Sequence, residues 1–109
     1  MSKDLEMSYL LDFYGDVLTE KQRDVMEQYY NDDLSLAEIA EEIGISRQGV
    51  RELIKKAEEE LRFYEEKLGL CYRFRQAQQS AEELLALLRQ AGVEGEVFQA
   101  AEALAEKIR

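Results

Sequence analysis

The side chains best suited to binding chemistry lie in one short segment of the sequence, residues 46–55. Arg51 follows Arg47 by four positions and Gln48 by three, so one face of a helix can carry all three. Arginine can bond guanine through two hydrogen bonds, and glutamine can do the same for adenine. We therefore predict that these three side chains contact base edges, whereas Ser46 and Lys55 contact phosphate.

The same basic residues also fit an ordinary solvated helix face. Glu52 lies among them, and three glutamates follow at residues 58–60, which weakens any basic stripe. Gly49, inside the same helix, either permits close approach to a phosphate or is merely tolerated beside a packed helix.

Most catalytic and metal-binding chemistry is missing from the composition. The 109 residues include no histidine, no tryptophan and a single cysteine, Cys71. Imidazole general bases, histidine-activated nucleophiles and the commonest transition-metal ligand are thereby excluded. No glycine-rich phosphate loop occurs either. We predict that the protein is not an enzyme, holds no cofactor or metal ion, and packs Cys71 as a small apolar side chain.

The sequence also predicts a cytoplasmic protein without a membrane span. Residues 1–6 contain no apolar stretch of the kind found in signal peptides. The longest apolar runs, such as residues 84–88, are far shorter than the roughly 20 residues that cross a bilayer. A single cysteine fits a reducing compartment.

The elements that position the candidate side chains are predicted helices joined by short turns. Apolar residues recur at helical spacing almost throughout, and proline is absent. Two capping boxes, Thr19 with Gln22 and Ser35 with Glu38, predict where two of the helices begin. One apolar face, Met7, Leu10, Leu11, Tyr14 and Leu18, predicts a first helix before them.

A helix-turn-helix motif is predicted between residues 36 and 54. Gly44 permits the left-handed backbone that ends a helix sharply, and Ser46 caps the next helix. Ala40 is small where the two helices must cross closely. The second helix of this motif usually enters a DNA major groove.

Further amphipathic segments follow the motif. The helix after Ser46 has its apolar stripe at Val50, Leu53, Ile54, Ala57, Leu61, Tyr64 and Leu68. A stripe in a different phase consists of Leu70, Phe74, Ala77, Ala81, Leu84 and Leu88, which predicts a break near Gly69. After Gly92, a last helix carries Val97, Ala101, Leu104 and Ile108.

We therefore predict an all-α fold without the wing of winged-helix proteins. A helix-turn-helix domain occupies residues 1–68, and residues 69–109 form a C-terminal helical extension. Because such extensions often join two copies, we expect a homodimer.

Several motifs resemble known families. The stretch from Leu18 to Leu61 resembles region 4 of bacterial sigma factors, through LTEKQR at residues 18–23, LSLAEIA at 34–40 and GISRQGV at 44–50. The fuller resemblance, from about residue 5 to residue 68, is to the YlxM family of small bacterial proteins. It rests on YLLDFY at 9–14, LTEKQR at 18–23, EIAEE at 38–42, SRQ at 46–48 and YEEKL at 64–68.

The resemblance implies a cytoplasmic helix-turn-helix protein with a regulatory role. In the YlxM family the gene typically lies beside that of the signal recognition particle (SRP) GTPase, and a role in the SRP pathway is inferred from this neighbourhood. The implied partners are then SRP components, the GTPase or its RNA. A sequence-specific DNA-binding transcriptional regulator is the alternative. Whether the motif binds DNA, RNA or protein stays open.

Charge is distributed very unevenly along the chain. The net charge is −10, yet residues 1–44 carry three basic and twelve acidic side chains, a net of −9. Residues 45–56 carry four basic side chains against Glu52 alone, a net of +3. Because nucleic-acid affinity depends on neutralising phosphates, only the face that begins near Ser46 suits a duplex. The acidic first two helices suit a basic partner.

Overall fold

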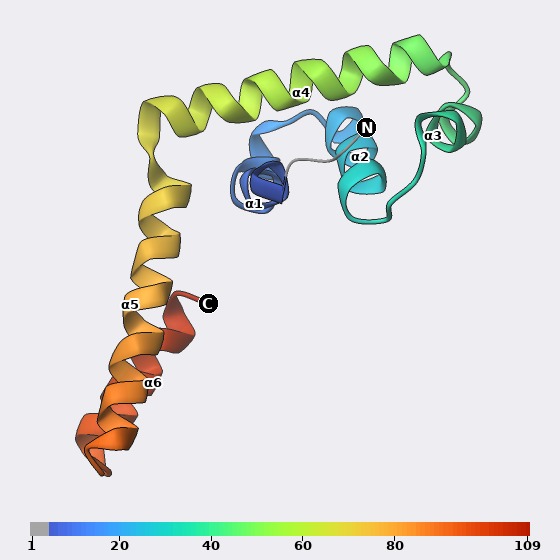
Figure 1. Ribbon diagram of the computed structural model, residues 1–109. Coiled ribbons are helices and arrows are strands. Elements are labelled where there is room, and N and C mark those ends of the chain that lie inside the picture. The colour runs from blue at the N-terminus through green and yellow to red at the C-terminus, as the bar shows by residue number, and fades with distance from the viewer. Residues whose placement is uncertain (1–4) are drawn as a thin grey trace. The chain divides into compact units, whose positions relative to one another are not determined.

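A computed structural model describes residues 5–109, over which the chain forms helices and short connections (Figure 1). The α-helices are α1 (Leu5–Tyr14), α2 (Glu20–Tyr30), α3 (Leu36–Ile43), α4 (Arg47–Leu68), α5 (Leu70–Gln90) and α6 (Glu96–Lys107), with a 3-10 turn, η1, at Gly15–Val17. No strand occurs within this range, which confirms an all-α fold without a wing. The chain divides into two compact units, one ending at Gly69 and one spanning Leu70–Arg109.

Helix α4 is the central helix of the first unit, because α1, α2 and α3 all contact it (Figure 1). The largest fully buried side chains of this unit are Met7, Val25, Met26, Ile39, Val50 and Leu61. Along α4 the predicted apolar stripe is buried at Val50, Ile54, Ala57 and Leu61. The stripe does not extend to Leu68, which is 51% exposed.

The first helix is shorter than its apolar face predicts. Helix α1 ends at Tyr14 and continues as the 3-10 turn η1. Leu18 lies outside the helix in extended backbone, with φ −78° and ψ 154°, although its side chain is still buried. Gly15 disfavours helix propagation, and the capping residue Thr19 requires extended backbone, so the chain leaves the helix between them.

Both predicted capping boxes are present. The Gln22 amide N–H donates to Thr19 Oγ1 at 3.2 Å, and the Thr19 N–H donates to Gln22 Oε1 at 3.1 Å. Ser35 and Glu38 exchange the same two hydrogen bonds, each at 3.1 Å. These reciprocal bonds satisfy backbone N–H groups that the first turn of a helix leaves without intrahelical partners. Helices α2 and α3 therefore start where the sequence predicts.

The second unit is a hairpin of α5 and α6, which run antiparallel beside each other (Figure 1). Helix α4 ends at Leu68 and α5 begins at Leu70, which confirms the predicted break at Gly69, whose φ is 62°. Gly92 then ends α5 with φ 70°, and the Val93 N–H donates to the Leu88 carbonyl at 2.9 Å. The core of the hairpin consists of Ala81, Leu85, Ala101 and Ala105, bordered by Leu88, Phe98 and Ile108.

The buried stripe of the hairpin matches the predicted one only in part. Ala81 and Ala101 belong to the core, and Leu88 and Ile108 border it, as predicted. Leu70 and Leu84 are exposed, whereas Cys71 and Leu85 are buried. On α6 the predicted core residues Val97 and Leu104 are exposed as well, and Ala105 is buried instead. Residues 84–88 are apolar around most of the helix circumference, so periodicity alone cannot select one stripe. The alanines of α6 allow the helices to approach closely and thereby fix the phase.

Among the residues that the structure describes, no helix combines the length and apolar character needed to cross a bilayer.

Candidate nucleic-acid interface

Three residues between α3 and α4 make the turn of the motif. Gly44 adopts φ 77° and ψ 30°, and the N–H groups of Gly44 and Ile45 both donate to the Ala40 carbonyl, at 2.9 and 3.2 Å. Ser46 returns to extended backbone, and its Oγ accepts a hydrogen bond from the Gly49 N–H at 3.0 Å. Within a few residues, the turn thus provides hydrogen-bond partners for a backbone carbonyl at the end of α3 and a backbone N–H at the start of α4.

Gly49 has a packing explanation inside this turn. A Cβ atom built at Gly49 would lie 3.3 Å from both Ile45 Cδ1 and Ser46 Oγ. The side chain of Ile45 therefore occupies the space beside the first turn of α4. Of the two predicted interpretations of Gly49, this contact favours the one in which it accommodates a packed neighbour.

The predicted site residues all lie at or near the start of α4. Ser46 is its N-cap, and Arg47, Gln48, Arg51 and Lys55 occupy its first three turns with exposed side chains. Within residues 5–109, the three cations Arg47, Arg51 and Lys55 form no ion pair. Their charges are thus available to an anionic partner. Ser46 Oγ uses an acceptor site on Gly49, so its hydroxyl proton remains the group that can reach a phosphate.

Carboxylates border this basic face on two sides. Gln48 Nε2 donates to Glu52 Oε1 at 3.4 Å, one helical turn further along α4. Arg51 lines a cavity of about 340 Å³ together with Asp33 and Glu38, and with Tyr29, Leu34, Ser35 and Leu36. Glu52 is evident from the sequence, but the neighbourhood of Arg51 is not. Sequence spacing does not reveal it, because the loop before α3 and Arg51 come to line one cavity only through the packing of α3 against α4.

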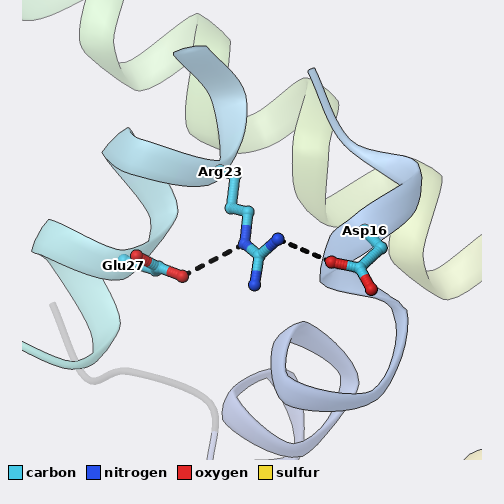
Figure 2. A network of polar contacts seen from close by, with 3 residues as sticks. All are labelled: Asp16, Arg23 and Glu27. Atoms are coloured by element: carbon cyan, nitrogen blue, oxygen red, sulfur yellow. Dashed lines mark hydrogen bonds and ion pairs between the residues drawn. The ribbon is translucent and has the colours of Figure 1, made fainter. Parts of the chain in front are cut away.

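By contrast, a cation in the acidic N-terminal half is held by carboxylates (Figure 2). Arg23 Nη1 lies 2.6 Å from Asp16 Oδ1, and Arg23 Nε lies 3.2 Å from Glu27 Oε1. The hydrogen bond to Glu27 and the charge of Asp16 raise the pKa of Arg23 above its usual value. Arg23 therefore joins η1 to α2, and its charge is engaged by two carboxylates of this acidic half.

The tight turn, the capped second helix and its exposed polar face define a helix-turn-helix protein. A model of the UPF0122 family, described as "Putative helix-turn-helix protein, YlxM / p13 like", matches residues 1–100. The chain belongs to this family, as the YlxM resemblance indicated.

Several relatives match over most of their length. The UPF0122 protein of Shouchella clausii is 44% identical over 108 residues, covering 99% of this chain and 95% of the relative. That of Halalkalibacterium halodurans is 48% identical over 101 residues, covering 81% and 93%. That of Caldanaerobacter subterraneus is 50% identical over 80 residues, covering 73% and 68%.

Proposed function

We propose that the protein is a regulator that binds duplex DNA through the first three turns of α4. The observation that carries this proposal is the exposure of Arg47, Arg51 and Lys55 directly after the tight turn, without ion pairs among the described residues. In helix-turn-helix proteins these turns of the second helix reach base edges in the major groove.

The surrounding charges restrict how the DNA can approach. Residues 1–44 have a net charge of −9, whereas residues 45–56 have a net charge of +3. Phosphates are repelled by the former and attracted by the latter, so only the face that begins at Ser46 can meet the duplex. Asp33 and Glu38 line the same cavity as Arg51, so we expect phosphates to approach Arg51 from outside that cavity.

Base contacts follow from the donors on this face. Arg47 and Arg51 each present a planar guanidinium that matches the acceptor pair of guanine. Gln48 must exchange its 3.4 Å bond to Glu52 for a base, and this exposed bond is a weak competitor. Glu52 is then free to accept a hydrogen bond from cytosine.

Selection from a random duplex pool with the full chain tests the proposal. We expect a consensus sequence, and Arg51→Ala should relax preference at one base position by about 1–3 kcal/mol. Arg73→Ala is the matched control, because it removes the same charge from an exposed position on α5. Absence of a consensus, or an unchanged consensus with Arg51→Ala, refutes sequence-specific binding.

A second candidate function is an accessory role in the SRP pathway, which the YlxM resemblance implies. The acidity of the N-terminal half supports it, because twelve acidic side chains among residues 1–44 suit a basic protein such as one that also binds RNA. On this proposal, the chain binds the SRP GTPase or its complex with SRP RNA in the cytoplasm.

A GTPase assay with the SRP GTPase and RNA separates the two functions. The double variant Glu20→Gln, Asp24→Asn neutralises two exposed carboxylates on α2 and should weaken SRP binding while leaving DNA selection unchanged. Arg51→Ala should do the reverse. No binding and no change of GTPase rate at micromolar protein would rule out the SRP role.

A further inference from the structure

Helix α1 is apolar around almost its whole circumference. Seven of its ten residues are apolar or aromatic, yet only four of these are buried, namely Met7, Leu10, Leu11 and Tyr14. The other three are exposed, Leu5 by 79%, Tyr9 by 48% and Phe13 by 39%. We call Leu5, Tyr9 and Phe13 the outer row. A helix that is apolar all round is typical of one that is covered on both sides.

The outer row lies on the side of α1 that points away from the core of the first unit. Its members are spaced by four positions, so they follow one another over about 12 Å of the helix and span about 80° of its circumference. Tyr9, in the middle, lies about 140° from Tyr14 and about 160° from Met7. These two buried side chains belong to the side by which α1 packs into the unit beside α4 (Figure 1).

The charged side chains of α1 are carboxylates that border the outer row. Glu6 precedes Tyr9 by three positions and Asp12 follows it by three, so they lie about 60° to either side of Tyr9. Both carboxylates are exposed. No basic side chain occurs between residues 5 and 17. The outer row therefore has an acidic edge on each side.

A groove between α1 and α4 extends the acidic edge at Glu6. This cavity of about 310 Å³ is lined by Glu6, Met7 and Leu10 of α1 and by Arg62, Glu65 and Glu66 of α4. Three carboxylates thus line the cavity together with a single guanidinium. The acidic character of this edge therefore comes from two helices of the unit and not from α1 alone.

These charges select the chemistry of what covers the outer row. A second copy docked through the same face brings the same carboxylates, and nucleic acid or an anionic lipid surface brings phosphates, so the acidic edges repel all three. A cationic protein segment is attracted instead. Lysine and arginine suit such edges, because their aliphatic stems lie along apolar surface while their charged ends reach carboxylates.

The length of the outer row fits a helix as its partner. Apolar side chains at positions i, i+4 and i+7 of a helix extend over about 10.5 Å, close to the length of the row. We propose that α1 docks a cationic amphipathic helix of another protein, with the apolar stripe of that helix on the outer row and its basic side chains beside Glu6 and Asp12. This docking does not rest on DNA binding by α4 or on which protein supplies the helix.

Binding of a designed peptide to the full chain tests the proposal. The probe is a fluorescently labelled peptide of about 15 residues, long enough to form a helix, made of leucine and lysine with the leucines on one helical face. We expect saturable binding at micromolar concentration, measured by fluorescence anisotropy. A peptide of the same composition, with its leucines scattered around the helix, should bind roughly tenfold more weakly or less, because it cannot bury them together.

The double variant Leu5→Gln, Tyr9→Gln tests the outer row itself. Glutamine is a good helix former, so the change removes apolar surface without disfavouring α1. We expect the dissociation constant of the peptide to rise by roughly tenfold or more. Circular dichroism checks that the variant keeps its helices.

Charge variants test the acidic edges separately. Glu6→Gln, Asp12→Asn should raise the dissociation constant by roughly threefold at low salt and by less at high salt, because exposed ion pairs are weak and screened. Glu20→Gln, Asp24→Asn is the matched control, since it neutralises two exposed carboxylates of α2 outside the outer row and should leave peptide binding nearly unchanged.

Four outcomes overturn the proposal. These are the absence of saturable binding, equal binding of the scattered peptide, unchanged binding to Leu5→Gln, Tyr9→Gln, and an equal loss with Glu20→Gln, Asp24→Asn, which would show that general acidity attracts the peptide. Sedimentation equilibrium of the chain alone adds a fifth. A dimer that Leu5→Gln, Tyr9→Gln dissociates would show that a second copy covers the outer row.

Discussion

The hydroxyl of Tyr14 donates a hydrogen bond to Glu65 Oε1 at 2.6 Å, joining α1 to α4 across 51 positions of sequence. The ring of Tyr14 is buried and stacks against Tyr64, with the ring centroids 6.1 Å apart. This contact holds α4 near its C-terminal end, while Val50 anchors it near its start. The helix that carries the candidate DNA-binding side chains is thus also the helix around which the first unit packs.

Removing the Tyr14 hydroxyl should therefore destabilise the first unit. Tyr14→Phe keeps the stacked ring but loses the bond to Glu65, which is partly buried, so we expect a loss of about 1 kcal/mol in the free energy of unfolding. Urea denaturation measures it. Glu65→Gln is the companion variant, since its amide oxygen still accepts the bond and should cost less. Equal stability of Tyr14→Phe and wild type contradicts this account.

Short-range patterns in the sequence predict the helix-turn-helix motif well. They do not predict contacts between residues that lie far apart in the sequence. The capping boxes at Thr19 and Ser35, and the left-handed Gly44, involve residues within a few positions of each other, so sequence spacing determines them. The cavity that Asp33 and Arg51 share depends on how α3 packs against α4. The burial of Leu85 instead of Leu84 depends on α6.

The left-handed backbone at Gly44 predicts a specific cost for any side chain there. Among the described residues other than the neighbours of Gly44 in the chain, no heavy atom lies within 4 Å of a Cβ built at Gly44, so the cost of Gly44→Ala comes from φ 77°. We expect a loss of roughly 1–2 kcal/mol in the free energy of unfolding. Glu41→Ala, an exposed change in the same helix, is the control and should have little effect. A neutral Gly44→Ala variant would show that the turn can rearrange.

The capping carboxylate of Glu38 makes α3 sensitive to acid. The hydrogen bond from the Ser35 backbone N–H, and then that involving the Ser35 side chain, lower the pKa of Glu38 below its ordinary value of 4.5. A lowered pKa in the folded state means that the stabilisation is present above pH 4.5 and is lost as the pH falls through the folded value. Titration of the Glu38 carboxyl by NMR measures the shift.

The variant Glu38→Gln separates the charge from the hydrogen bond. Gln22 already fills the same position in the capping box of Thr19, so a glutamine at position 38 can accept the Ser35 N–H. We expect the variant to keep α3 capped and to lose the part of the acid sensitivity that Glu38 contributes. If the pKa of Glu38 equals that of an exposed glutamate, the capping bond does not persist in solution.

Lys55 should contribute to DNA affinity without contributing to base preference. It is exposed one helical turn beyond Arg51, where a phosphate contact is predicted. Loss of one phosphate contact should reduce the slope of log affinity against log salt by roughly 0.9, equally for the selected sequence and a scrambled duplex. Fluorescence anisotropy over a series of salt concentrations measures both slopes for Lys55→Ala. Lys67→Ala is the matched control, because Lys67 is an exposed lysine of α4 about 18 Å further along the helix. A base-specific effect of Lys55→Ala would show that Lys55 contacts a base edge and not a phosphate. An equal loss of slope with Lys67→Ala would show that the duplex does not lie at the start of α4.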